Sequence, residues 1–248
     1  GELVERQEWH TSYSDLRPLI EPYVGHAVAR VGEHPHILDV GCGTSGLGLG
    51  LLSDVPTARL TLVDVVETLV DALREQHKAD PRITAVADDC RTLDSLEPGS
   101  VTVALDKGTL DALDNPEDRL ACFKAVARTL QRPHGLFVTV SFASPTRILF
   151  LRRGAKSLNL ELRLRLIRAG LELRLVALIS PSFQDIEDKP DDLTRDELPM
   201  ILFKGPLRNE PLVSFENERL ASEIVLEQVT EQERKSADDD ATGNFVWP

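Results

Sequence analysis

Two kinds of pattern alternate between residues 36 and 142. Short apolar runs, typical of buried strands, are separated by longer stretches in which apolar residues recur every three or four positions, as in amphipathic helices. We expect strands at 36–40, 59–64, 82–89, 101–106 and 135–142, and helices at 45–54, 66–78 and 116–131. This alternation predicts βαβ units and a parallel sheet. The element order indicates a doubly wound, Rossmann-like α/β fold with helices on both faces.

The pattern changes after this region. Residues 158–167 and 171–179 alternate with period two, which predicts an antiparallel pair of strands. The last core strand is expected at 199–205. We therefore predict one domain over 1–205, with a β-arm or insertion at 158–198, followed by an acidic and partly mobile extension over 206–248.

Composition narrows the class of protein. The chain has 248 residues, of which 42% are hydrophobic and 28% charged, as in soluble globular proteins. Its formal net charge of −13 argues against binding nucleic acid, because an acidic surface repels polyanions. No apolar run reaches the roughly 18–20 residues that a membrane span needs, so no membrane partner is expected. The three cysteines and six histidines show no metal-ligand spacing, so no metal is expected, and a reducing compartment fits the cysteines best.

The charge is unevenly distributed. Residues 147–174 contain eight basic and two acidic side chains, whereas residues 206–248 contain ten acidic and four basic ones. The basic segment is expected to recognise an acidic patch on a protein substrate, since exposed charge guides association and fixes register.

The strongest chemical signal follows the first predicted strand. Residues 39–46 read Asp-Val-Gly-Cys-Gly-Thr-Ser-Gly, and Gly41, Gly43 and the glycine three positions later form G-x-G-x-x-G at the start of a helix. Glycines there let the backbone approach a ligand closely. Asp64 ends the second strand, where a carboxylate can accept both ribose hydroxyls, and Asp88-Asp89 ends the third, where an acid can meet an adenine amino group. Because the carboxyl ends of parallel strands lie on one edge of the sheet, these three strand ends together predict a single site that binds a nucleoside.

Asp39 favours one kind of nucleoside ligand. An acid two residues before the first glycine can hold the ammonium group of S-adenosylmethionine, whereas it would repel a pyrophosphate. S-adenosylmethionine, converted to S-adenosylhomocysteine, is therefore the predicted cofactor. A nicotinamide-dependent dehydrogenase is a more distant alternative.

Several segments of the chain resemble one known family, the seven-β-strand (class I) methyltransferases that modify protein lysines. The closest subgroup contains the citrate synthase and elongation factor 1-alpha lysine methyltransferases. The resemblance covers roughly residues 8–205, and LDKGTLDAL is its most specific part. The segments that carry it are EWHTSYSDLRPLIEPYV (8–24), ILDVGCGTS, LVD at strand two, DCRTLD, LDKGTLDAL (105–113), SFASPTR (141–147) and PMILFKG (199–205).

The resemblance implies a function and a set of cofactor contacts. It implies a seven-stranded methyltransferase sheet with an antiparallel final strand, and transfer of a methyl group to an accessible lysine of a folded protein. Citrate synthase and elongation factor 1-alpha are the leading candidates; the first implies a mitochondrial enzyme and the second a cytoplasmic one. Matched residue by residue, the family's cofactor contacts fall on Trp9, Gly41, Asp64, Val65, Asp89, Cys90 and Lys107.

Two further residues are candidates for the acceptor side. Asp106 ends the fourth strand, and by position it could face the substrate, where a carboxylate can guide an incoming ammonium group. An ion pair or turn cap is an equally good interpretation of Asp106 beside Lys107. Phe142, at the end of the fifth strand, is expected to line the opening through which the acceptor reaches the methyl group.

Other functions stay open. A small-molecule N- or O-methyltransferase is the main alternative, because the same core serves many acceptors. A base-modifying enzyme is disfavoured, since the fourth strand ends in Asp-Lys-Gly-Thr without the Asn/Asp-Pro-Pro-aromatic motif that stacks a flipped base. A catalytically inactive, cofactor-binding partner subunit is the most distant alternative.

Overall fold

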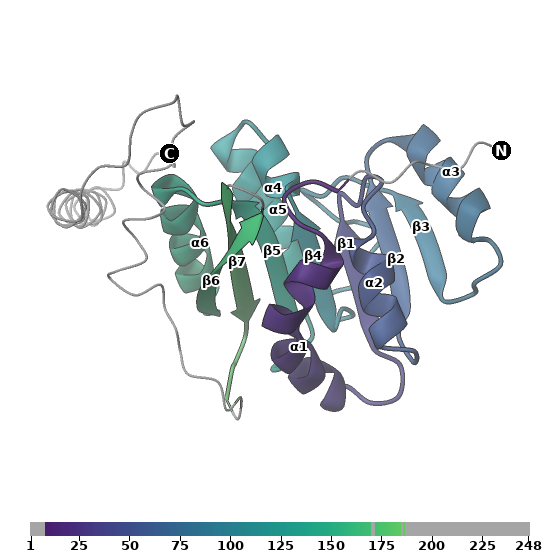
Figure 1. The fold of residues 1–248 in the computed structure, drawn as a ribbon, viewed down its shortest axis with the longest axis horizontal. Helices are drawn as coiled ribbons and strands as arrows, with labels where there is room; N and C mark the ends of the chain where they lie inside the picture. The colour runs from purple at the N-terminus through teal and green to yellow at the C-terminus, as the bar shows by residue number, and fades with distance from the viewer. Residues whose placement is uncertain (1–7, 170–171, 185, 187–248) are drawn as a thin grey trace, which may run out of the picture.

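The computed structural model describes residues 8–169, 172–184 and 186. A seven-stranded sheet forms its centre (Figure 1), in the spatial order β3-β2-β1-β4-β5-β7-β6. The strands are β1 (His36–Val40), β2 (Arg59–Asp64), β3 (Ile83–Ala87), β4 (Val103–Lys107), β5 (Leu136–Phe142), β6 (Glu161–Ala169) and β7 (Glu172–Ser180). The helices are α1 (Tyr13–Ala29), α2 (Leu47–Asp54), α3 (Glu67–His77), α4 (Thr109–Ala112), α5 (Pro116–Thr129) and α6 (Pro145–Ser157).

The pairing confirms the predicted fold class. Strands β1 to β5 are parallel, and β7 runs antiparallel to both of its neighbours, β5 and β6. The chain builds outward from β1 to β2 and β3, then returns to the other side of β1 with β4. Ligands of open α/β sheets bind beyond the carboxyl ends of the strands at such a switch in direction.

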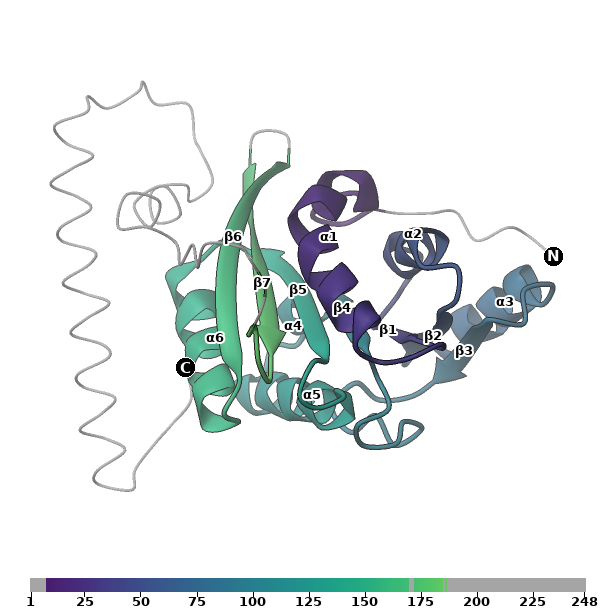
Figure 2. The same ribbon diagram turned by 90° about the horizontal axis from the view of Figure 1, so that it is seen from below.

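Helices cover both faces of the sheet (Figure 2). On one face, α1, α2 and α3 bury Leu16, Leu51 and Val70 in a core cluster with side chains from the strands. On the other face, α4, α5 and α6 form the second cluster, which includes Phe123 and Phe137. Parallel strands need apolar residues on both faces, and β1 and β4 are buried along their whole length.

The hairpin of β6 and β7 differs from the sequence prediction. Residues 161–180 do not form an arm beside the domain, because β7 pairs with β5 from Phe137↔Ile179 to Phe142↔Arg174 and completes the sheet. The antiparallel pairing expected for these residues is confirmed. Leu164 and Leu175 enter the core cluster beneath α6, which explains the apolar alternation. The strand expected at 199–205 and the extension expected at 206–248 lie outside the described residues.

Helix α6 occupies the start of the basic segment. Its N-cap is Ser144, whose hydroxyl accepts a hydrogen bond from the Arg147 amide at 3.2 Å, and proline occupies the first turn. Ser followed by Pro is a typical helix start. In the described part of the chain, no helix has the length and apolar character needed to span a membrane.

Candidate active site

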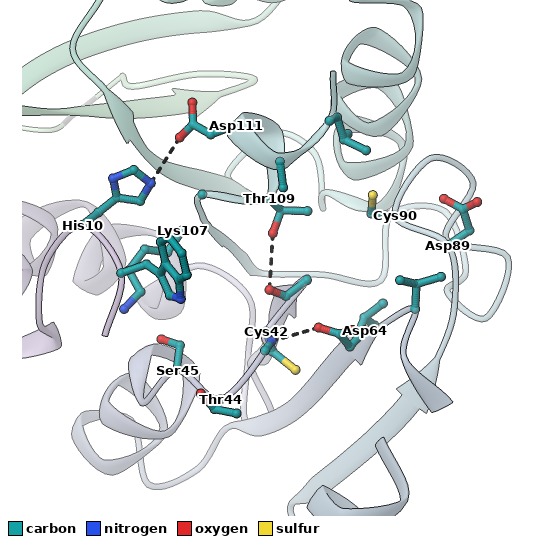
Figure 3. Close-up of a pocket in the computed structure, with 18 of the residues that line it drawn as sticks. His10, Cys42, Thr44, Ser45, Asp64, Asp89, Cys90, Lys107, Thr109 and Asp111 are labelled. Atoms are coloured by element: carbon teal, nitrogen blue, oxygen red, sulfur yellow. Dashed lines mark hydrogen bonds and ion pairs between the residues drawn. The ribbon is translucent and has the colours of Figure 1, made fainter. Parts of the chain in front are cut away.

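A cavity of about 610 Å³ opens at the carboxyl ends of β1, β2 and β4. His10, Asp111 and Lys107 lie at one end of it, and Asp89 and Cys90 at the other (Figure 3). The sequence-predicted residues that line this cavity are Trp9, Gly41, Gly43, Asp64, Val65, Asp89, Cys90, Lys107 and Phe142. The structure therefore brings together residues that are more than a hundred positions apart in the chain.

The glycine turn after β1 has no room for a side chain at its first position. Gly41 has a φ of +58°, and a Cβ atom there would lie 2.2 Å from Oγ1 of Thr109. That hydroxyl donates a hydrogen bond of 2.8 Å to the Val40 carbonyl. The turn is thus packed closely against Thr109 at the start of α4, and Gly41 lines the cavity without a side chain.

Asp64 ties the glycine turn to the next strand. Its Oδ2 atom accepts a hydrogen bond from the Gly43 amide at 2.9 Å, and its Oδ1 atom accepts one from the Val66 amide at 3.0 Å. The side chain is buried at the cavity wall, while Val65 beside it is 73% exposed. A carboxylate fixed in this way still has lone pairs available for ligand hydroxyls.

The loop after β3 contributes a second acidic group. Arg91 forms an ion pair with the Asp89 carboxylate at 2.6 Å and lowers its pKa below the ordinary value. Cys90 is partly buried against the core cluster that contains the thiol of Cys122. This loop therefore presents the charged pair of Asp89 and Arg91 at the surface and the apolar side chain of Cys90 toward the core.

The segment from Glu8 to Thr11 crosses the top of the site. The Glu8 carboxylate forms an ion pair with the Lys107 ammonium and accepts a hydrogen bond of 2.9 Å from the Gly46 amide at the start of α2. The Thr11 carbonyl also accepts from Lys107, at 3.1 Å. Lys107 is buried, so these contacts satisfy its charge and hold the segment, with Trp9, over the cavity.

Sequence and structure comparisons identify the domain. Residues 37–135 match the family model described as a methyltransferase domain. The match spans 99 of the 248 residues, and over them the chain is similar to a methyltransferase domain. Its cofactor is S-adenosylmethionine.

Solved structures share the fold of this methyltransferase at low identity. An S-adenosylmethionine-dependent methyltransferase from Clostridium acetobutylicum has a TM-score of 0.54 at 12% identity, covering 69% of this chain and 92% of that one. One from Methanosarcina mazei has a TM-score of 0.51 at 16% identity, with 67% and 98% covered. Precorrin-6y C5,15-methyltransferase from Geobacter metallireducens has a TM-score of 0.53 at 12% identity, with 71% and 93% covered. No curated protein matches the chain.

The residues of the methyltransferase site fit this cofactor. The bare turn at Gly41 permits a close approach of the ligand, and Asp64 presents acceptors where ribose hydroxyls are expected. When bound, S-adenosylmethionine supplies a methyl group on a positively charged sulfur. Among the described residues, no cluster of side chains has the composition of a metal site.

Asp39 lies beneath the cavity and does not line it. The side chain is 2% exposed, and its Oδ2 atom accepts a hydrogen bond of 2.9 Å from the Gly48 amide in α2. Burial raises its pKa to about 7. The predicted contact with the cofactor ammonium does not agree with this placement. Asp39 instead fixes α2, and with it the glycine turn, against β1.

Asp106 is likewise directed into the fold. Its carboxylate accepts hydrogen bonds from the Thr139 hydroxyl at 2.6 Å and from the Thr109 amide at 2.8 Å, the first amide of α4. Burial raises its pKa to about 6. The structure therefore corrects the expectation that Asp106 faces the substrate. Its geometry is that of the turn cap considered as the alternative.

Two cavity residues were missed by sequence reasoning. The Nε2 atom of His10 lies 3.2 Å from the Asp111 carboxylate, in a contact between the N-terminal segment and α4. Asp111 belongs to the LDKGTLDAL motif, which could have indicated it, whereas nothing in the sequence near His10 indicates its partner. Phe142, which was predicted, packs edge-on against the His10 ring with 4.6 Å between ring centroids.

Replacing Asp64 should weaken cofactor binding. In Asp64→Ala, the Gly43 and Val66 amides lose their acceptor, and so would the ribose hydroxyls that Asp64 is predicted to bind. Hydrogen bonds to charged groups contribute about 1.5–3 kcal/mol, so we expect the Kd for S-adenosylmethionine to rise by roughly 10- to 100-fold. Titration calorimetry measures this. Asp94→Ala, at an exposed position in a neighbouring loop, is the control, and equal affinities in the two variants would contradict the role of Asp64.

Proposed function

We propose that the methyltransferase acts on the ε-amino group of a lysine in a folded protein. The supporting observation is the acceptor mouth of the cavity. Trp9 is 67% exposed and Phe142 is 50% exposed, and both line the cavity together with the Asp111 carboxylate. Two exposed aromatic side chains can pack along an alkyl chain, and a carboxylate attracts its ammonium group.

The chemistry of a lysine acceptor suits this mouth. Methyl transfer from a sulfonium is an in-line displacement, for which positioning is the main requirement. The acceptor must arrive uncharged, and a lysine with a pKa of about 10.4 loses its proton at neutral pH at a cost of roughly 4–5 kcal/mol. An apolar channel favours the neutral amine by desolvation. The motif at residues 105–113, which resembles lysine methyltransferases, supports the same acceptor.

Citrate synthase and elongation factor 1-alpha are the first protein substrates to test. The purified enzyme, S-adenosylmethionine and each candidate are incubated, and the products are analysed by peptide mass spectrometry. We expect one lysine to gain one, two or three methyl groups. A parallel screen of a lysate with radiolabelled cofactor identifies any other protein acceptor. The Gly41→Ala variant, which should not bind cofactor, is the control.

The outcomes separate the proposed function from its alternatives. Labelling of small amines or phenols without labelling of any protein replaces the lysine proposal with the small-molecule one. Cofactor binding by calorimetry without transfer to any acceptor favours a binding subunit without activity.

The basic segment is the proposed docking surface for an acidic protein substrate. Arg153 and Lys156 of α6 belong to it, and Lys156 is exposed. In this proposal the KM for the protein substrate rises with ionic strength while kcat changes little, because salt screens attraction between exposed charges.

A further inference from the structure

His10 combines a rare backbone conformation with a buried imidazole. Its φ is +62°, a region that residues other than glycine seldom occupy, and its side chain is 3% exposed. The ring packs over Gly108, where a Cβ atom would lie 2.8 Å from Nε2. Such strain persists only where surrounding contacts enforce it, and it is concentrated at functional sites.

Asp111 holds this imidazole at the wall of the cavity. One carboxylate oxygen of Asp111 lies 3.2 Å from His10 Nε2. The other accepts hydrogen bonds from the Ser141 hydroxyl at 2.6 Å and from Arg147 at 2.8 Å. Burial favours the neutral acid, but His10, Ser141 and Arg147 together lower the pKa of Asp111. A permanent carboxylate beside Nε2 favours the tautomer with the proton on Nε2, which leaves the lone pair on Nδ1.

The Nδ1 atom of His10 has no hydrogen-bond partner among the described residues. It is buried, and each polar atom that is buried without a partner in a folded protein requires an explanation. The ring lines the cavity together with Trp9 and Phe142, the two exposed aromatic residues of the acceptor mouth. An acceptor that enters the cavity beside these two side chains therefore lies next to the imidazole, whose Nδ1 atom can accept a hydrogen bond from it once the ring is reached.

We propose that His10 is the base that removes a proton from the acceptor amine. The acceptor ammonium gives one proton to Nδ1, and the freed nitrogen lone pair forms a bond to the methyl carbon. The carbon–sulfur bond breaks, and its electron pair stays on sulfur. The imidazolium, stabilised by Asp111, then releases its proton to water. The amine acceptor rests on the proposed function, whereas the role of His10 applies to any acceptor with an ionisable N–H or O–H group.

The charges around His10 suit this role. Asp111 on α4 is the negative group in contact with the ring, and Arg147 on α6 lies behind it. Lys107 at the end of β4 is paired with Glu8. Arg174 on β7 lies over the far ring, 5.1 Å from the centroid of Phe142. The contact charge is negative, so a proton arriving on Nδ1 creates an ion pair with Asp111.

The test compares His10→Gln with His34→Gln, a control at an exposed position before β1. We expect His10→Gln to lower kcat by about 10²- to 10⁴-fold, the usual contribution of a general base, while the Kd for S-adenosylmethionine is unchanged. The acidic limb of the pH–kcat profile should move in His10→Gln to the position set by the acceptor amine alone, and should stay at the wild-type position in the control. The acceptor is whichever substrate the labelling experiment identifies. If the lysine proposal is wrong, the labelling experiment finds the methyl group on something other than a lysine. If the His10 proposal is wrong, the pH profile of His10→Gln matches that of the wild type.

Several results would overturn the proposal. These are wild-type kcat and pH dependence in His10→Gln, or a loss confined to cofactor binding. If His10→Gln does not fold, His10→Asn takes its place, with the same expected loss of kcat and the same overturning result. Independently of any acceptor, ¹⁵N NMR of the wild-type protein should show the proton of neutral His10 on Nε2, and a proton on Nδ1 would also overturn the proposal.

Discussion

Gly41→Ala should abolish measurable cofactor binding. The substituted residue would be held at a φ of +58°, which costs about 1–2 kcal/mol for a side chain with a Cβ atom. It would also overlap the Thr109 side chain, at 2.2 Å from Oγ1, and overpacking adds about 1–3 kcal/mol. The turn can relieve the overlap only by moving into the cavity or by displacing α4. We expect the Kd for S-adenosylmethionine to rise by at least about 100-fold, since about 2.7 kcal/mol corresponds to that factor.

Gly99→Ala separates strain from overlap. Gly99 has a φ of +67°, but a Cβ atom there meets nothing within 4 Å, and the residue lies in an exposed loop before β4. Gly99→Ala should lower the free energy of unfolding, because alanine is strained in a left-handed backbone conformation, and should leave cofactor affinity unchanged. Calorimetry of both variants measures their affinity for S-adenosylmethionine, and thermal melts measure their stability. If Gly41→Ala binds cofactor as tightly as Gly99→Ala, the turn is not the cofactor cradle.

Arg147→Met should destabilise the whole domain. Arg147 is 9% exposed and donates hydrogen bonds to the Asp111 carboxylate at 2.8 Å and to the Leu110 carbonyl at 3.1 Å. Methionine keeps most of the side-chain volume but leaves a buried carboxylate without its cation. Breaking a buried ion pair in this way costs about 3–5 kcal/mol. The Ser141 and His10 contacts remain, so we expect a loss of about 3 kcal/mol in the free energy of unfolding, measured in urea.

Lys78→Met provides the matched control. Lys78 forms its ion pair with Glu75 on the exposed surface of α3, where solvent screens the charges. We expect its free energy of unfolding to be the same as that of the wild type. Equal stabilities of Arg147→Met and Lys78→Met would show that the ion pair beneath the site contributes no more than a surface pair.

The sequence alone was sufficient to predict the fold and the edge of the sheet at which the cavity opens. The apolar runs identified the five parallel strands, and the glycine turn, Asp64 and Asp89 marked the strand ends that meet at the cavity. Parallel strands place their carboxyl ends on one edge of the sheet, so position in the sequence translates directly into position in space.

The direction of a side chain at a strand end was not predictable. Asp39 and Asp106 are on the expected strands, yet each carboxylate turns back to an amide at the start of a helix. Whether an acidic side chain at a strand end contacts a ligand or a helix depends on the path of the turn that follows. The pattern of apolar residues does not predict that path. His10 was missed for a related reason, because its partner lies about a hundred residues away in the chain.

Among the described strands, β6 forms one edge of the sheet and β3 the other, and the sequence of β6 affects how molecules meet at its edge. An open strand edge offers unpaired amides and carbonyls to a second molecule, which is a common start of aggregation. Arg163 and Arg165 alternate with leucines along β6, and both contact the Tyr23 hydroxyl on α1. A second copy docking edge to edge would bring its own arginines against these, and like charges in paired strands repel. The same alternation that buries the leucines under α6 therefore discourages the sheet from continuing into a neighbouring molecule.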